Sequence, residues 1–291
     1  MNGTVGIAGL GLIGGSMAKA IKSRTDLRVF GFDIDEDVTK LALEEGAIDG
    51  VLHESNLAEC GLVLVALYPE DVIAYSKKIF AHLKPGTIVV DLAGVKARIC
   101  EELKTPAKDR GIIFVGGHPM AGIEKSGYKN SFAELFEGAV MILCKDDITE
   151  DNSKESVLDE LSRFFLKLGF GYIKITDARE HDEIIAYTSQ LAHLVSSAYV
   201  KSETLDKRHG FSAGSFKDLT RVAKLDENLW TELFLENREN LIEETDKILK
   251  NIQSYRDALI SSDEMALKEL LKSGSELKKR DDEKELEWLK Q

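Results

Sequence analysis

A glycine-rich loop near the start of the chain, flanked by an apolar strand and a helix, constrains the fold more than any other feature. Residues 4–8 predict a buried strand, residues 9–14 form the loop GLGLIG, and residues 16–22 predict the helix. A second strand follows at residues 27–32, so these segments together predict a βαβ unit. Parallel strands of this kind occur in sheets that helices cover on both faces, which predicts a doubly wound α/β domain.

Each part of this loop suits contact with the phosphates of a dinucleotide. Gly9 permits the tight turn, Gly11 lets the backbone approach a pyrophosphate, and Gly14 allows close packing of helix and strand. Leu12 and Ile13 stand where the chain enters the helix, whose first N–H groups lack partners within the helix and attract phosphate. The alternative, in which the glycines serve only a tight turn, is disfavoured by the strand and helix around them.

Asp33, at the end of the second strand, stands where a carboxylate can accept a hydrogen bond from a ribose 2′-hydroxyl. The same carboxylate would repel a 2′-phosphate. Ile34, Asp35 and Glu36 follow it and supply no cation to offset that repulsion. The sequence therefore predicts NAD rather than NADP.

Net charge and cysteine content limit the classes of partner. The chain of 291 residues has a formal charge of -13, which argues against binding to nucleic acid or to an anionic membrane surface. Its three cysteines, Cys60, Cys100 and Cys144, show no metal-like or paired spacing, and no charged-then-apolar leader precedes the first strand. We expect a reduced, cytoplasmic protein without a membrane span.

Two regions of different character follow one another. Short β-rich runs alternate with helical segments up to about residue 175, and all four prolines lie before that point. Long helices then follow, for the first of which Asp177 is a good N-cap. The predicted segments are strands at 62–67, 87–91, 112–115, 139–144 and 171–175, and helices at 70–82, 96–104, 154–168, 177–203, 216–223, 227–249 and 263–277. We expect a Rossmann-type parallel-sheet domain over residues 1–175 and an all-helical domain over 176–291, the latter forming a homodimer.

His118 follows the predicted strand at 112–115 within the segment GGHPMAG. In open α/β sheets, ligands bind outside the carboxyl ends of the strands, which places this imidazole beside the expected nicotinamide. An imidazole can accept or release a proton near neutral pH. Considered alone, the histidine serves equally well as a turn cap.

The stretch 118–127 (HPMAGIEKSG) resembles the characteristic segment of the prephenate/arogenate dehydrogenases of tyrosine biosynthesis. The resemblance extends over nearly the whole chain, through residues 9–16, 91–96 and 216–221 (FKDLTR), the helix of His193, Trp230 and residues 236–237. It implies NAD-dependent oxidative decarboxylation of a dianionic cyclohexadienyl substrate, with prephenate favoured. It also implies that His118 is the base that accepts the ring hydroxyl proton.

A dianion bound by an acidic protein requires local cations. Lys217 and Arg221 are four residues apart and share a helix face, for which Ser215 is the expected N-cap. A lysine in the first turn opposes the helix dipole, which favours a bound anion, although a solvated basic face is the alternative. By resemblance, Arg221 binds a substrate carboxylate through its planar fork.

The resemblance assigns two further residues to the substrate pocket, His193 and Glu124. Lys96 follows Asp91 at the carboxyl end of another predicted strand, which places it near the same pocket. A lone helical histidine is more often a packing residue, so this role rests on the resemblance alone for His193. Gly94 departs from the family, because many members carry a serine three residues after Asp91. The remaining histidines are expected on surfaces or at helix ends: His53, His82, His181 and His209.

Several alternatives stay open at this point. Arogenate differs from prephenate only in carrying an amine where prephenate has a ketone, and Glu124 could serve either substrate. A β-hydroxyacid dehydrogenase is disfavoured because the helix of Tyr187, Gln190 and His193 lacks that family's glycine–lysine pattern. A non-catalytic NAD-sensing protein is compatible with Gly94. Feedback inhibition by tyrosine is a further hypothesis from the resemblance.

Overall fold

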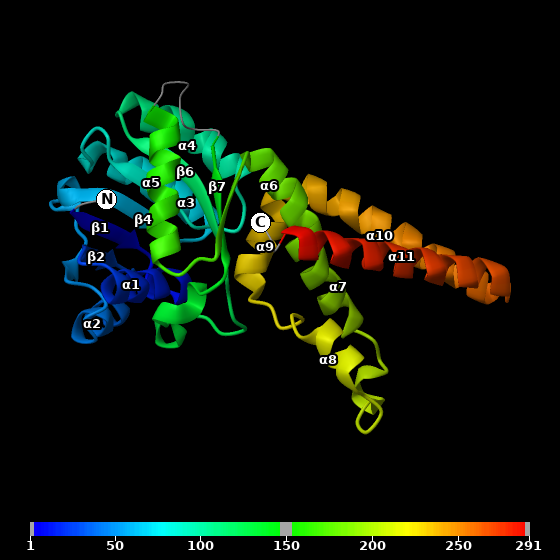
Figure 1. Ribbon diagram of the computed structural model, residues 1–291. Coiled ribbons are helices and arrows are strands. Elements are labelled where there is room, and N and C mark those ends of the chain that lie inside the picture. Colours follow the sequence, from blue (N-terminus) through cyan, green and yellow to red (C-terminus); the bar gives the residue numbers. More distant parts are fainter. Residues whose placement is uncertain (1–2, 146–152, 289–291) are drawn as a thin grey trace. The chain divides into compact units, whose positions relative to one another are not determined.

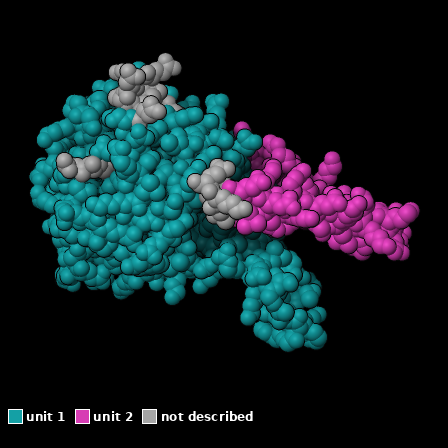
Figure 2. All heavy atoms as spheres, viewed as in Figure 1, with its two compact units in different colours: residues 1–238 teal, residues 239–291 magenta. Residues whose placement is uncertain are grey.

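The computed structural model describes residues 3–145 and 153–288. The chain forms two compact units, residues 1–238 and residues 239–291, which Figure 2 shows in teal and magenta. The sheet expected for residues 1–175 lies in the first unit, and so do the first helices after it. No helix within the described ranges combines the length and apolarity that a bilayer crossing requires.

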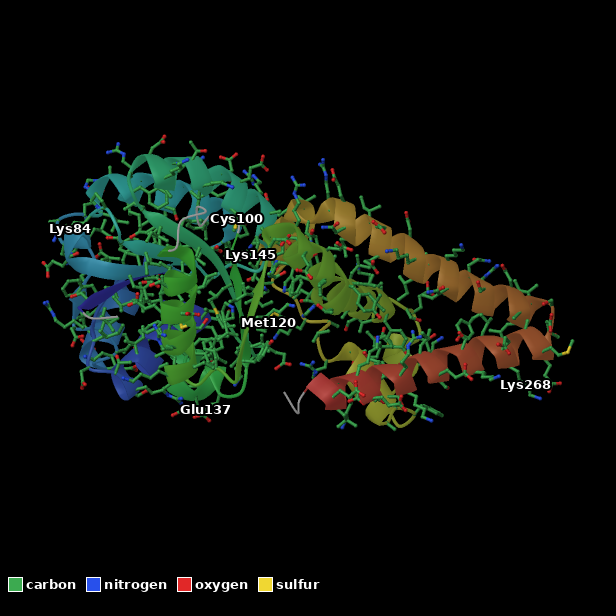
Figure 3. The ribbon with its side chains drawn as sticks, turned by 45° about the horizontal axis from the view of Figure 1, so that its top comes forward. Lys84, Cys100, Met120, Glu137, Lys145 and Lys268 are labelled. Atoms are coloured by element: carbon green, nitrogen blue, oxygen red, sulfur yellow. The ribbon has the colours of Figure 1, made fainter. Side chains whose placement is uncertain are left out.

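The first unit is built on an eight-stranded sheet with the order β3-β2-β1-β4-β5-β6-β7-β8 (Figure 1). The predicted doubly wound parallel sheet is confirmed except at one pair, because β6 and β7 are antiparallel whereas all other neighbouring strands are parallel. Figure 3 marks opposite ends of the antiparallel pair by Met120 and Lys145. The strands are β1 (Thr4–Ala8), β2 (Arg28–Phe32), β3 (Gly50–Val51), β4 (Cys60–Val65), β5 (Ile88–Asp91), β6 (Ile113–Met120), β7 (Val140–Cys144) and β8 (Tyr172–Thr176).

Helices cover both faces of this sheet because side chains alternate between faces along each strand. Leu62 and Leu64 pack in one apolar core with α1 (Leu12–Arg24) and α5 (Ser153–Lys167). Val63 and Val65, on the other face, pack with α3 (Pro69–Ile79) and α4 (Ala97–Asp109). Helix α2 (Glu36–Glu44) follows β2.

The chain after the sheet is helical, as predicted. Asp177 accepts a hydrogen bond from the Glu180 backbone N–H and so caps the first of these helices. The helices are α6 (Ala178–Ile185), a π-helical turn (Ala186–Gln190), α7 (Leu191–Tyr199), α8 (Gly214–Thr220), α9 (Glu227–Glu236), α10 (Arg238–Ile260) and α11 (Glu264–Trp288). Asn237 interrupts the helix that was expected to run unbroken over residues 227–249.

Candidate active site

A cavity of about 1060 Å³ opens at the carboxyl ends of the strands, where α/β sheets bind ligands. Its lining comes from the glycine-rich loop, from the loops after β2, β4 and β5, from β6 and the loop after it, and from α9. The predicted site residues among the lining are Gly11, Leu12, Ile13, Asp33, His118 and Glu124. Gly94, Trp230 and Leu233 line the same cavity.

The three glycines of the loop are needed for different reasons. A Cβ on Gly9 would lie 2.3 Å from the Ala66 carbonyl oxygen, and Gly9 has a φ of +85°, which favours glycine. A Cβ on Gly14 would lie 1.8 Å from the Gly9 carbonyl oxygen. At Gly11, however, a Cβ would meet no protein atom within 4 Å. Gly11 therefore leaves free space on the cavity side at the start of α1, which fits the approach of a pyrophosphate.

Asp33 binds the glycine loop and also faces the cavity. Its Oδ2 accepts a hydrogen bond of 2.7 Å from the Leu10 backbone N–H, and its Oδ1 accepts one of 3.0 Å from Asp35. An ionised carboxylate has about four acceptor positions, so two remain for ribose hydroxyls. The loop and this carboxylate together fit the adenosine side of a dinucleotide.

His118 lies in β6, half-buried at the wall of the cavity. Its Nδ1 is 2.9 Å from Nε2 of His181. Burial, and after it the electrostatic effects of His181 and Lys96, hold the pKa of His118 well below its usual value of 6.5. The imidazole is therefore neutral at physiological pH, as a base must be before it accepts a proton.

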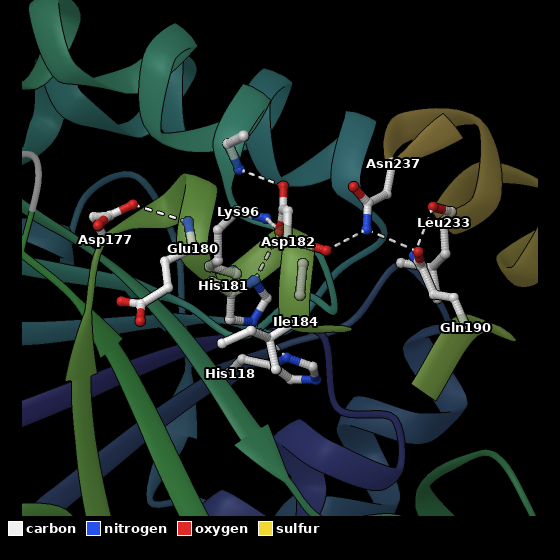
Figure 4. Close-up of polar contacts among 12 residues, drawn as sticks. Lys96, His118, Asp177, Glu180, His181, Asp182, Ile184, Gln190, Leu233 and Asn237 are labelled. Carbon is white, nitrogen blue, oxygen red and sulfur yellow. Dashed lines mark hydrogen bonds and ion pairs between the residues drawn. The ribbon is translucent and has the colours of Figure 1, made fainter. Parts of the chain in front are cut away.

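His181 and Asp182 stand directly behind His118 (Figure 4). His181 is 2% exposed, and its Nδ1 lies 2.7 Å from Oδ1 of Asp182. The expectation that His181 lies on a surface or helix end was wrong, whereas His53, His82 and His209 are exposed as expected. A signal for this pair was present, since residues 178, 181, 182 and 185 form the buried face of α6 and two of them are polar.

Lys96 lies behind the cavity wall. It is fully buried, its ammonium forms an ion pair with Asp91, and it is not among the residues that line the cavity. Burial raises the pKa of the Asp91 carboxyl, which the ammonium and two backbone N–H groups oppose. A buried ammonium requires such a partner, and that pairing holds Lys96 away from the cavity where substrate contact was expected.

Glu124 and Arg221 join the sheet part of the site to the helical part. Arg221 Nη1 donates to Glu124 Oε1 at 2.8 Å, and Glu124 lines the cavity, whereas the Arg221 side chain is 67% exposed. A hydrogen bond from its own backbone N–H, and then Arg221, lower the pKa of the Glu124 carboxyl. The Arg221 guanidinium therefore does not line the cavity itself but is bonded to Glu124, which does.

The expected cap of α8 was wrong. Ala213, not Ser215, precedes the helix, and no side chain caps it. Lys217 is exposed and stands in the last turn of this short helix, where a cation suits the helix dipole. The dipole therefore gives no argument for an anion at Lys217.

His193 reaches the site through an aromatic neighbour. Its ring stacks on Trp230, with centroids 3.9 Å apart, and Trp230 lines the cavity. His193 Nδ1 lies 2.8 Å from the Ser189 carbonyl oxygen, which can only accept, so Nδ1 carries the proton and Nε2 is left without one. Burial lowers the pKa of His193 and so favours this neutral form.

Gly94 presents no side chain, and therefore no hydroxyl, to His118. A Cβ built on Gly94 would lie 3.9 Å from His118 Nε2 and 3.2 Å from a methyl group of Leu233. The second distance is tight, so a serine here would require Leu233 to shift. Nε2 consequently faces the part of the cavity between the loop after β5 and α9.

Comparisons with known proteins agree with this arrangement. The family model of the prephenate dehydrogenase nucleotide-binding domain matches residues 17–172, and that of the prephenate dehydrogenase dimerization domain matches residues 177–273. A prephenate dehydrogenase of Lactococcus lactis subsp. cremoris is 30% identical over 280 residues, covering 94% of this chain and 75% of that protein.

Two further relatives have related names. A cyclohexadienyl dehydrogenase of Zymomonas mobilis is 32% identical over 270 residues, which cover 89% of each chain. A solved prephenate dehydrogenase of Aquifex aeolicus, in complex with hydroxyphenyl propionate and NAD+, is 28% identical, with a TM-score of 0.80 and coverage of 97% of this chain and 98% of that chain. The chain belongs to the prephenate dehydrogenase family.

Proposed function

We propose that this protein catalyses the NAD-dependent oxidative decarboxylation of prephenate to 4-hydroxyphenylpyruvate. One observation carries the proposal: a single cavity holds both the nucleotide-type loop with Asp33 and the neutral imidazole of His118. The family match, and the NAD+ and hydroxyphenyl ligand named for the Aquifex aeolicus relative, support the same reaction.

The cofactor fits the residues present. Gly9, Gly11 and Gly14 shape the phosphate contact, Leu12 and Ile13 offer the first N–H groups of α1, and Asp33 binds the ribose. When bound, NAD supplies the acceptor for the hydride that leaves the hydroxyl-bearing ring carbon. The carboxylate of Asp33 repels the extra phosphate of NADP and so favours NAD.

His118 supplies the base. Its Nε2 accepts the proton of the ring hydroxyl as the hydride leaves, and loss of the ring carboxylate as carbon dioxide then makes the ring aromatic. The His118 imidazolium returns the proton to the ring oxygen, which gives the phenol of the product and restores the neutral base. Positioned base catalysis of this kind contributes about 10²- to 10⁴-fold in rate. The imidazolium that forms keeps its Nδ1–H on His181.

The substrate's charged groups are held by residues of the helical part. Arg221 exchanges its exposed bond to Glu124 for a substrate carboxylate, and Lys217 supplies a further donor. The neutral His193 orients the substrate through its bare Nε2, which can only accept a hydrogen bond. Glu124 then faces the substrate side chain, and Lys96 acts through Asp91 behind the wall rather than by direct contact. In this proposal residues 1–175 bind the cofactor and residues 176–291 bind substrate and form a homodimer.

The test measures NADH formation with prephenate and, separately, with arogenate. We expect turnover with prephenate, and expect His118→Asn to lower kcat by about 10²- to 10⁴-fold while the Kd for NAD stays unchanged. His82→Gln, at an exposed histidine before β5, is the control. Turnover with arogenate alone assigns the chain to the amine substrate, and NAD binding without turnover of either compound contradicts the proposal.

Regulation by tyrosine follows as part of the proposal, because tyrosine carries the hydroxyphenyl ring and a carboxylate that this site would bind. Competition should raise the apparent KM for prephenate without changing kcat. A cytoplasmic location completes the proposal, since prephenate and NAD are metabolites of that compartment. An unchanged KM at saturating tyrosine would contradict the regulatory part.

A further inference from the structure

We propose that His181 and Asp182 form a positioning pair that fixes His118 in the tautomer with a proton on Nδ1 and a bare Nε2 facing the cavity. The catalytic consequence rests on the proposed function, whereas the tautomer itself does not. The three side chains form one continuous line of hydrogen bonds from the start of α4 to the cavity wall (Figure 4).

The line begins at Asp182, whose carboxylate is surrounded by donors. Oδ1 accepts from the Lys96 backbone N–H and Oδ2 from the Ala97 backbone N–H, both at 2.8 Å, at the beginning of α4. Both oxygens therefore act as acceptors, which suits an ionised carboxylate at a helix N-terminus. A carboxylate in this state can only accept from His181 Nδ1, so that nitrogen must carry a proton.

The second step concerns His181. Burial lowers its pKa, which favours a neutral ring that carries a single proton. With the proton on Nδ1, the Nε2 atom of His181 has a lone pair and must accept at its 2.9 Å contact with His118. Nδ1 of His118 is then the donor, and Nε2 of His118 is free to accept a proton from a substrate.

The surroundings hold this line in place. The groups that face His181 are His118 from β6, Asp182 from its own helix, Asp91 from the end of β5, and Lys96 from the start of α4. Asn237 donates to the Asp182 carbonyl oxygen and to the Gln190 side chain, each at 2.8 Å, which fixes α6 from its far side. If Asp182 served only to cap the N-terminus of α4, no histidine would be needed between Asp182 and His118. Capping alone therefore does not explain the buried His181.

This arrangement orients His118 as a base. A carboxylate that fixes the tautomer of a catalytic imidazole also stabilises the imidazolium formed during reaction, and loss of the correct tautomer costs orders of magnitude in rate. Here the orientation passes through a second imidazole. His181 remains neutral throughout, and the proton taken from substrate stays on His118 until it returns to the ring oxygen of the product.

The first experiment reads the tautomer directly. Protein with ¹⁵N-labelled histidine is examined by long-range ¹H–¹⁵N NMR at neutral pH, and His118→Asn identifies the His118 signals. We expect His118 to show a protonated Nδ1 and a bare Nε2. A proton on Nε2 of His118 in the folded protein overturns the proposal, whether or not the protein oxidises prephenate.

The second experiment uses variants of the middle residue. His181→Leu should lower kcat about 10²-fold or more, with the KM for prephenate and the Kd for NAD within about twofold of wild type. His181→Gln keeps an oxygen that can accept from His118 Nδ1–H, and should recover at least about tenfold of that loss. His82→Gln serves as the matched surface control, and thermal unfolding shows that each variant is folded.

The outcomes separate the two proposals. Wild-type protein that turns over neither substrate contradicts the function, while the NMR result still decides the tautomer. If His181→Leu does not fold, His181→Gln and the NMR measurement carry the test. Folded His181→Leu with unchanged kcat, or a loss in kcat that His181→Gln does not recover at all, overturns the positioning role.

Discussion

At the residue scale, the environment of His118 determines how activity should depend on pH. Burial, and then the electrostatic effects of His181 and Lys96, lower its pKa well below 6.5, so the bare Nε2 persists into mildly acidic solution. Two carboxylates also contact the neighbours of His118: Asp182 is hydrogen-bonded to His181, and Asp91 is paired with Lys96. Protonation removes the lone pair, which means that activity is lost only as pH falls through the lowered pKa.

We therefore expect kcat/KM for prephenate to stay constant as pH decreases from 8 through about 6.5, and to fall with a midpoint below the unperturbed histidine value. The carboxyl of Glu124 does not interfere, because its pKa is also lowered. Circular dichroism at each pH shows that the protein stays folded. An acid limb centred at or above 6.5 would show that His118 is not the titrating base.

The residues of the site differ in how far sequence could predict them. His118 and Asp33 could be placed at the cavity because each stands just beyond a predicted strand, and strand ends are where such sheets bind ligands, although β6 in fact continues through His118 to Met120. His181 was missed because its role depends on a contact with a residue 63 positions away. Lys96 was placed at the correct strand end, but its burial against Asp91 follows from packing that no local pattern reports.

At the scale of elements, periodicity predicted which segments are helices and strands but not where they stop. Helix α1 begins at Leu12, before the expected residue 16. This early start depends on Gly14, because any side chain at that position of the helix would collide with Gly9. The helix expected at 227–249 breaks at Asn237, whose amide bonds to Asp182 and Gln190. The antiparallel direction of β7 likewise depends on the path of the loop between 121 and 139.

The glycine loop allows a matched pair of substitutions. Gly14→Ala places a Cβ 1.8 Å from the Gly9 carbonyl oxygen, so it should lower the unfolding temperature markedly. Gly11→Ala meets no protein atom within 4 Å and should leave stability near wild type. It should nevertheless weaken NAD binding by about tenfold or more, because the added methyl occupies space used by the pyrophosphate.

Calorimetry and an NAD titration on the same two variants check this division. Gly122→Ala is the control, because its Cβ also meets open space and it lies outside the loop. Gly46→Ala is unsuitable, because the φ of +70° at Gly46 would strain an alanine. Normal NAD affinity in Gly11→Ala would mean that the cofactor does not approach the loop as proposed. Unchanged stability in Gly14→Ala would contradict the packing described for helix α1.

At the scale of the whole molecule, the second unit presents apolar side chains to solvent. Along α10, Ile242, Leu249, Ile252 and Leu259 are more than half exposed and recur at intervals of seven, three and seven residues. Such spacing keeps them on one face of a helix, and exposed apolar stripes of this kind mark protein–protein contacts. The match of residues 177–273 to a dimerization domain fits that interpretation.

We expect the stripe to lie in the interface of a homodimer. Ile252→Glu places a charge in the stripe, and a two-fold interface contains the change twice, so dimer affinity should fall by roughly tenfold or more. Asn251→Glu adds the same charge at an exposed neighbouring position off the stripe and should leave affinity unchanged. Sedimentation equilibrium measures both. A wild-type monomer across the accessible concentrations, or equal affinities for the two variants, would show that this face of α10 does not hold the subunits together.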